Sequence, residues 1–210
     1  MDKLKDLTNK GTTTLGIATK EGIVLAADKR ATMGYLIAHK EVQKIFAVTD
    51  NIALTTAGMV GDNQMLLRYL KTQMNLHEIK KGTKPTVKAC ATLLSHILYG
   101  NRFSPWPYYV QIIVGGYDYT GFSLYTLDPG ASMIQDKYIS TGSGSVVAYG
   151  VLQTNFRDNL TLEEAAKIAY KAIRAAIERD IGTGEAVDLV LITKDGCRFL
   201  DKNEIKKYSE

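Results

Sequence analysis

Cysteine is scarce in this chain, which has only Cys90 and Cys197 among its 210 residues. The two lie far apart and form no Cys-x-x-Cys pair, so we expect free thiols in a reducing compartment, with a disulfide between them as the alternative. Histidine is equally sparse, and His39, His77 and His96 lack the spacing of metal ligands. We therefore expect neither a metal ion nor a cofactor.

The sequence also lacks any apolar run long enough to span a membrane, and residues 1–6 are charged, unlike those of a signal peptide. The net charge of +4 is small, and no stretch concentrates Lys and Arg as a nucleic-acid-binding surface does. We therefore expect a soluble, cytoplasmic protein that binds neither membranes nor nucleic acid. Its hydrophobic fraction of 45% and its length suit one ordinary globular domain.

Common catalytic and phosphate-binding motifs are missing as well. The chain has neither a G-x-S-x-G elbow nor a Walker loop, and no spacing points to a Ser-His-Asp triad, although the residue types leave one open. The segment 142–145, Gly-Ser-Gly-Ser, begins like a dinucleotide fingerprint, but Val147 stands where the third glycine belongs. A tight turn that exposes the Ser143 hydroxyl is the better interpretation.

Apolar patterns predict strands and helices in alternating groups. Alternation or continuous apolar runs predict strands at residues 12–17, 23–27, 42–48, 52–57, 108–115, 122–127, 133–138, 187–193 and 197–200. Helical spacing predicts helices at about 62–80 and 85–99, a short one after Ser145, and one that begins with a capping box of Thr161 and Glu164. Strand groups separated by helix pairs, without a regular βαβ repeat, favour an α+β fold with two sheets and helices outside them.

Two charged residues do not fit a purely structural interpretation. Asp28 ends the apolar run 23–27, where it would ordinarily mark the exit of a strand into solvent, with Arg30 as a neighbouring partner. Lys44 alternates with apolar residues in a strand whose two faces are both largely apolar, so we expect it to be at least partly buried. A buried ammonium is costly unless it is paired, and Asp28 is the candidate partner; extension to solvent is the alternative. Such a pair is a candidate functional site.

A third acidic residue, Asp180, follows the last long helix at its C-terminal end, where the helix dipole disfavours negative charge. Either Arg174 or Arg179 offsets that charge, or the helix has already frayed, or other hydrogen-bond donors compensate for it. A functional site is one way to supply such donors.

The segment 11–14, Gly-Thr-Thr-Thr, opens the first strand after a short polar leader. A threonine hydroxyl is a poor nucleophile unless a base removes its proton. Cleavage of the bond between Gly11 and Thr12 would create an α-amine of pKa about 8, which can act as that base. Before cleavage the nitrogen is an amide, so the leader would keep the enzyme inactive.

With these motifs in order, the chain resembles the β subunits of 20S proteasomes, which are N-terminal-nucleophile (Ntn) hydrolases, and its undivided form is similar to the archaeal subunits. The resemblance runs from Gly11 to about Thr193 and rests on Gly-Thr-Thr-Thr at 11–14, Ala-Ala-Asp-Lys-Arg at 26–30, His-Lys at 39–40, Lys-Ile-Phe at 44–46, Ala-Gly-Met-Val-Gly-Asp at 57–62, Ser-Thr-Gly-Ser-Gly-Ser at 140–145, Tyr-Gly-Val-Leu at 149–152 and Arg-Asp at 179–180. It implies a four-layer αββα sandwich of two antiparallel sheets flanked by helices, the Ntn-hydrolase fold. It also implies that residues 1–11 are a propeptide removed on maturation and that residues 12–210 are a single catalytic domain.

The resemblance implies a catalytic role for each matching residue. Thr12 would be the nucleophile, and its amine, freed by autocleavage after Gly11, would be the proton acceptor. Lys44, held charged by Asp28, would lower the basicity of the Thr12 hydroxyl. The backbone N–H of Gly58 would stabilise the oxyanion.

Further residues would hold the amine and the substrate. Ser143, Asp180 and Thr183 would form hydrogen bonds around the amine, and Thr183 stands where the family usually has serine. Thr32 and Gly58 would pair with the backbone of an extended substrate. The first specificity pocket would have no charge at its base, which favours cleavage after apolar residues, and it would be lined by Ala31, Val42, Phe46, Thr56, Val60 and Gln64.

The function implied is that of a threonine-type endopeptidase that degrades unfolded proteins. Its partners would be other β subunits in a heptameric ring, the α-subunit rings of an α7β7β7α7 particle, a regulatory ATPase acting through the α rings, and polypeptide substrates. One alternative is a structural β subunit, which would lack the threonine or the lysine, whereas this chain has Thr12 and Lys44. The other is the related bacterial two-component protease, whose subunits are shorter and form hexameric rings.

Overall fold

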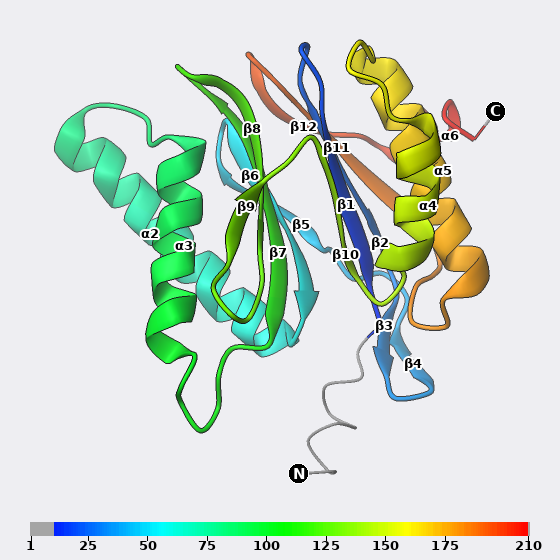
Figure 1. Cartoon of the computed structure of the whole chain (residues 1–210), viewed down its shortest axis with the longest axis horizontal. Coiled ribbons are helices and arrows are strands. Elements are labelled where there is room, and N and C mark those ends of the chain that lie inside the picture. The colour runs from blue at the N-terminus through cyan, green and yellow to red at the C-terminus, as the bar shows by residue number, and fades with distance from the viewer. Residues whose placement is uncertain (1–10, 210) are drawn as a thin grey trace.

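Two five-stranded antiparallel sheets form the middle of the protein, which a computed structural model describes for residues 11–209 (Figure 1). The first sheet has the order β10-β1-β2-β11-β12 and consists of β1 (Thr13–Ala18), β2 (Ile23–Asp28), β10 (Tyr138–Gly142), β11 (Val187–Thr193) and β12 (Gly196–Phe199). The second has the order β5-β6-β7-β8-β9 and consists of β5 (Ile45–Thr49), β6 (Ile52–Gly58), β7 (Val110–Asp118), β8 (Gly121–Leu127) and β9 (Met133–Gln135). Strand β2 is buried along its whole length, which explains its continuous apolar run.

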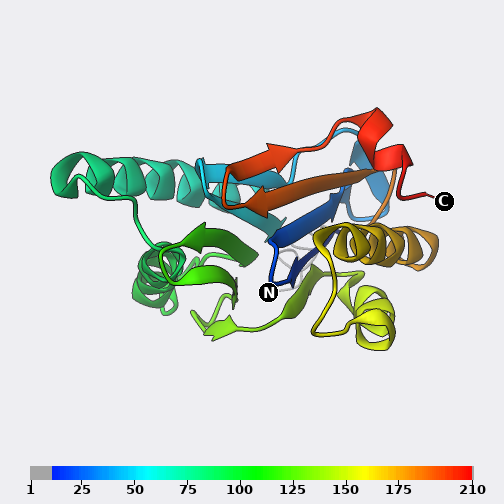
Figure 2. The same ribbon diagram turned by 90° about the horizontal axis from the view of Figure 1, so that it is seen from above.

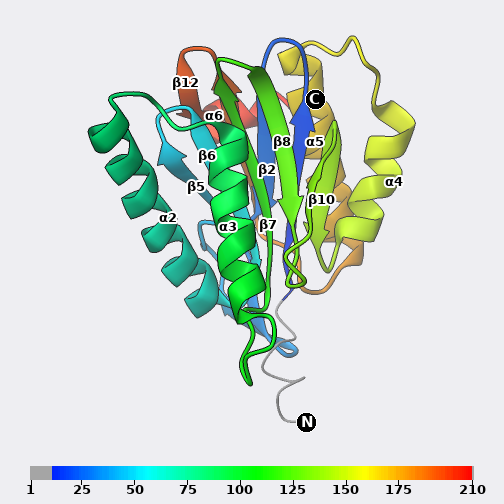
Figure 3. The ribbon, with the colours of Figure 1, turned by 60° about the vertical axis from the view of Figure 1, so that its left-hand side comes forward.

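Pairs of helices cover the two outer faces (Figures 1 and 2). Helices α2 (Val60–Lys81) and α3 (Val87–Asn101) lie across the second sheet, as Figure 3 shows, whereas α4 (Ser145–Asn155) and α5 (Leu162–Arg179) pack on the first. The predicted capping box of Thr161 and Glu164 begins α5. A short helix, α6 (Lys202–Lys206), follows the last strand. These layers confirm the expected four-layer αββα sandwich. No helix in residues 11–209 is long and apolar enough to cross a membrane.

Three apolar clusters fill the spaces between the four layers. The middle cluster lies between the sheets and includes Leu25, Ile113 and Leu124, all fully buried. Because side chains alternate along a strand, the other face of each sheet packs against its own helix pair. The apolar filling ends at one edge of this space, where polar residues collect at the ends of several strands.

The structure differs from the predicted elements in four places. Residues 31–39 form a hairpin of β3 (Ala31–Met33) and β4 (Leu36–His39), which was missed because β4 is exposed throughout and shows no alternation. Helix α6 was missed as well. The strand predicted at 42–48 begins at Ile45, so Lys44 lies in the loop before it. The strand predicted at 133–138 is divided between β9 and β10, which belong to different sheets.

Candidate active site

The candidate site lies at one end of the space between the two sheets. Thr12 directly precedes β1, and antiparallel pairing places Thr13 opposite Gly142 at the end of β10. Asp28 ends β2 on one side of β1, and Gly58 ends β6 in the other sheet. Strand pairing therefore gathers residues more than a hundred positions apart in the sequence.

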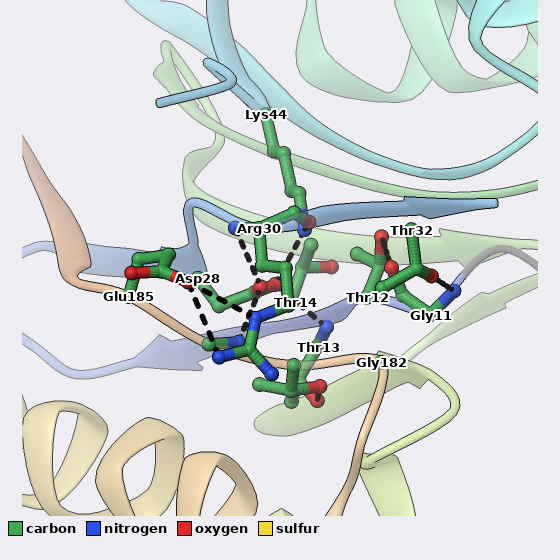
Figure 4. A network of polar contacts seen from close by, with 12 residues as sticks. Gly11, Thr12, Thr13, Thr14, Asp28, Arg30, Thr32, Lys44, Gly182 and Glu185 are labelled. Atoms are coloured by element: carbon green, nitrogen blue, oxygen red, sulfur yellow. Dashed lines mark hydrogen bonds and ion pairs between the residues drawn. The ribbon is translucent and has the colours of Figure 1, made fainter. Parts of the chain in front are cut away.

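Thr12 is buried, with 7% of its surface exposed, and its hydroxyl donates to the carbonyl oxygen of Gly11 at 2.6 Å (Figure 4). The peptide bond between the two residues is intact in this chain, so the Thr12 nitrogen is an amide, which donates to Ser143 Oγ at 3.1 Å. The amide of Gly11 donates in turn to Thr32 Oγ1 at 2.8 Å. The hydroxyl thus already lies against the carbonyl group of the peptide bond before it.

Asp28 is completely buried and accepts four hydrogen bonds (Figure 4). Its Oδ1 accepts from Lys44 Nζ at 2.6 Å and from the Thr13 amide at 2.9 Å. Its Oδ2 accepts from the amides of Arg30 and Gly184, both at 3.0 Å. A carboxylate without water requires such donors, so the fold around Asp28 is built to hold a negative charge.

Lys44 is buried as well, with 4% of its surface exposed, and its Nζ also donates to the Arg30 carbonyl at 2.6 Å. Burial lowers the pKa of its ammonium below the ordinary value of 10.5, whereas the charge and hydrogen bond of Asp28 oppose that shift. The possible ion pair between Arg30 and Asp28 does not form, because the Arg30 guanidinium contacts Glu185 at 3.2 Å and the Ile181 carbonyl at 2.9 Å.

A chain of hydroxyl groups leads from the Thr12 nitrogen into the protein. Ser143 Oγ accepts from that nitrogen and donates to Asp180 Oδ2 at 2.5 Å. Thr183 Oγ1 donates to the same oxygen at 2.5 Å, which leaves Thr13 Oγ1 as the donor in its 2.6 Å contact with Thr183. Asp180 is the C-terminal cap of α5, and its carboxylate accepts from these hydroxyls and from the Gly182 amide, not from Arg174 or Arg179.

Gly58 has a backbone conformation that excludes other residues. Its φ is +98°, and a Cβ at this position would lie 2.2 Å from the carbonyl oxygen of Tyr109. Gly58 lines both of the cavities that open beside Thr12. The backbone of Gly58, which carries no side chain, is therefore accessible from both cavities.

The larger cavity has a volume of about 680 Å³, and Thr32, Gly58, Ser143 and Asp180 all line it. The smaller one, of about 260 Å³, begins at Thr12 and runs beneath α2. Every residue predicted for the specificity pocket lines the smaller cavity, namely Ala31, Val42, Phe46, Thr56, Val60 and Gln64.

Two charged residues, Lys44 and the exposed Arg68, also line the smaller cavity, although the residues predicted for it are all uncharged. Arg68 was missed although the sequence held a signal for it. Val60, Gln64 and Arg68 follow one another at intervals of four, which places them on one face of α2.

Sequence reasoning also missed a group of buried hydroxyls next to Thr12. Thr14 Oγ1 lies 2.8 Å from Thr55 Oγ1 in the other sheet and 2.7 Å from Thr141 Oγ1 in β10. Threonine is common in strands, so no pattern distinguishes these residues beforehand. Their contacts join both sheets directly behind the candidate nucleophile.

The remaining candidate groups take no part in this site. Cys90 and Cys197 are free thiols, as expected, and burial raises the pKa of each to about 12, so both stay protonated and unreactive. Within residues 11–209, no three His, Cys, Asp or Glu side chains gather as metal ligands.

Comparison with known proteins shows the family of the chain. A model of the proteasome subunit family matches residues 8–192, so the chain belongs to that family. A protein of Methanocorpusculum labreanum named "Proteasome subunit beta" is 48% identical over 199 residues, which cover 94% of this chain and 93% of that protein. Proteins of the same name from Archaeoglobus profundus and Methanothermobacter thermautotrophicus are each 45% identical, over 99% and 97% of this chain and 96% of each relative.

Proposed function

We propose that this chain is the catalytic β subunit of a 20S proteasome core and acts as a threonine-type endopeptidase on unfolded polypeptides. The observation that carries the proposal is the contact of the Thr12 hydroxyl with the Gly11 carbonyl, beside the buried pair of Lys44 and Asp28. The relatives named "Proteasome subunit beta", at 45–48% identity over nearly the whole chain, support it.

Maturation is the first step of the proposed mechanism. Thr12 Oγ attacks the carbonyl carbon of Gly11, the proton passes to the departing nitrogen, and the peptide bond becomes an ester. Water then hydrolyses the ester, which leaves a carboxylate on Gly11 and restores the Thr12 hydroxyl. Residues 1–11 depart as the propeptide, and residues 12–210 remain as the catalytic domain with a free α-amine on Thr12.

The mature site uses that amine as its base. The amine takes the proton of Thr12 Oγ as the oxygen attacks a substrate carbonyl, and it delivers the proton to the leaving amine. The ammonium of Lys44 favours negative charge on Oγ, and the N–H of Gly58 stabilises the oxyanion. Ser143, which contacts the Thr12 nitrogen in the precursor, keeps the amine oriented with Asp180 and Thr183 behind it. Water then hydrolyses the ester on Thr12 Oγ, which releases the acyl fragment as a carboxylate and restores the hydroxyl.

Substrate binding divides between the two cavities. Thr32 and Gly58 pair with the extended backbone in the larger cavity, and the side chain before the cleaved bond enters the smaller one. Val42 and Phe46 in the wall of the smaller cavity favour an apolar substrate side chain. Arg68 adds a positive charge to its lining.

Assembly follows from the same proposal. The chain joins other β subunits in a heptameric ring, two such rings stack between α-subunit rings, and a regulatory ATPase feeds polypeptides through the α rings. We place this particle in the cytoplasm, where the free thiols of Cys90 and Cys197 stay reduced.

Intact-mass measurement of the subunit from assembled particles tests the proposal. The wild-type chain should lose residues 1–11 and cleave peptides, and Thr12→Ala should keep its leader and cleave nothing. Thr12→Ser retains both the hydroxyl and the amine, so it should mature and remain active. An active particle that keeps its leader, or a Thr12→Ala particle that cleaves peptides, would refute the proposal. Hexameric rings would favour the bacterial two-component protease instead.

A further inference from the structure

Gln111 joins the two sheets at the open end of the candidate site. It is the second residue of β7, and its Oε1 accepts the N–H of Gly142 at 2.8 Å from the last residue of β10 in the other sheet. Its neighbours Val110 and Ile112 face the helices, whereas Ile113 faces the first sheet. By alternation Gln111 shares the face of Ile113, so its side chain reaches across the space between the sheets.

The residue that Gln111 holds cannot move without moving the site. Gly142 has a φ of +90°, and a Cβ there would lie 2.0 Å from the carbonyl oxygen of Thr12. The next residue is Ser143, whose Oγ contacts both the Thr12 nitrogen and Asp180. A shift of the Gly142 backbone therefore shifts the hydroxyl that orients the Thr12 nitrogen.

Strand β10 needs an anchor at this point. It is the edge strand of its sheet and pairs only with β1, so its other side has no neighbouring strand in residues 11–209. Gly142 is also its last residue, where pairing ends. Gln111 is itself exposed and lines the larger cavity together with Gly58 and Ser143, so its contact with Gly142 is made at the site rather than in the packed core.

We propose that Gln111 is a positioning residue for catalysis by Thr12. By accepting the N–H of Gly142 it fixes the turn from Gly142 to Ser143 against the second sheet. Ser143 Oγ then stays within hydrogen-bond distance of the Thr12 nitrogen throughout the reaction. The inference rests on the proposed function, and Gln111 acts through Ser143 without touching the reacting atoms.

Two substitutions separate this role from simple packing. Gln111→Met keeps the length of the side chain but removes the acceptor, so kcat should fall about tenfold while KM changes less than about twofold. Gln111→Glu keeps an acceptor oxygen in the same place and should retain kcat within about threefold. Gln135→Met is the matched control, because Gln135 is an exposed glutamine at the end of β9 in the same sheet. It should leave both constants unchanged.

The assay uses assembled particles whose Thr12 terminus has been verified by intact mass, with a fluorogenic peptide at several concentrations. Wild-type kcat in Gln111→Met, or equal losses in the Met and Glu variants, would overturn the inference. If Gln111→Met fails to mature, the result for Gln111→Glu tests the inference. A Gln111→Glu chain that matures with near-normal kcat supports the positioning role, and one that fails to mature refutes it. Activity that survives Thr12→Ala would instead refute the proposed function, and the inference would fall with it.

Discussion

The buried carboxylate of Asp28 gives the sharpest test of how this site is held together. Asp28→Asn keeps the shape of the side chain but removes its charge and replaces one acceptor oxygen with an NH2 group. The wild-type carboxylate accepts from Lys44, Thr13, Arg30 and Gly184, two donors on each oxygen. In the variant, one pair of donors faces an NH2 group, and the Lys44 ammonium is left buried beside a neutral partner.

The magnitude follows from that count. Removing one partner of a buried ion pair costs about 3–5 kcal/mol, because the remaining charge is uncompensated. Without Asp28, the charge and hydrogen bond that raise the pKa of Lys44 are lost, so burial lowers that pKa further. We therefore expect the free energy of unfolding to fall by about 3–5 kcal/mol, with peptidase activity lost as Lys44 gives up its proton.

Urea unfolding of the precursor, carried out in a Thr12→Ala background so that the chain stays uncut, measures the effect. The double variant Asp28→Asn/Lys44→Met removes the stranded ammonium and should regain about 2–3 kcal/mol relative to Asp28→Asn alone. Activity, tested with Thr12 restored, should stay absent in both variants. An Asp28→Asn chain as stable as its parent, or a double variant no more stable than Asp28→Asn, would refute this account of the pair.

Three further outcomes follow. Burial lowers the pKa of Lys44, so its ammonium loses its proton at a pH below the ordinary pKa of 10.5. The alkaline fall in the pH profile of kcat should therefore begin below pH 10.5. Lys44→Arg should have a lower kcat but lack that alkaline fall, because a guanidinium keeps its proton. Gly142→Ala places a Cβ at a φ of +90° and against the carbonyl oxygen of Thr12, so maturation should fail. The control Gly150→Ala has open space around it inside α4 and should raise the free energy of unfolding by about 0.5–1 kcal/mol. Arg68→Met should lower cleavage after Glu a few-fold relative to cleavage after Leu, because an exposed charge pair contributes about 0.2–1 kcal/mol; an unchanged ratio would exclude Arg68 from the pocket's selectivity.

The layers of the fold were predictable because the pattern of apolar residues indicates which faces of a helix or strand are buried. Strand β2 is apolar up to its last residue, Asp28, and buried throughout, and α5 carries both an amphipathic face and a capping box. The hairpin of β3 and β4 escaped prediction because β4 is exposed and its pairing depends on contacts that local pattern does not encode. The division of residues 133–138 between two sheets likewise depends on tertiary contacts, because the local pattern of either half resembles a strand.

For the site, the sequence indicated the charges but not all of their partners. Lys44 was predictable as buried, and Asp28 as its partner, because an unpaired ammonium among apolar residues is too costly. Arg30 seemed a second partner by proximity, yet its guanidinium lies with Glu185, which is 155 positions away in the chain. Gln111 gave no signal, because a polar residue near the start of a strand is ordinarily solvated. Thr55 gave none because threonine is common within strands.

The intact bond before Thr12 explains how one set of residues would serve the two proposed reactions, maturation and peptide cleavage, at different rates. In the precursor the Thr12 nitrogen is an amide that donates to Ser143, so it cannot take the proton of the hydroxyl beside it. The proposed attack on Gly11 would therefore proceed without a base on Thr12, and it would need to occur only once per chain. The proposed cleavage would turn that nitrogen into an amine next to Ser143, with Lys44 and Asp28 in place. Maturation thus adds a base to a site whose other parts are preorganised, so each later turnover should be much faster than the first cut.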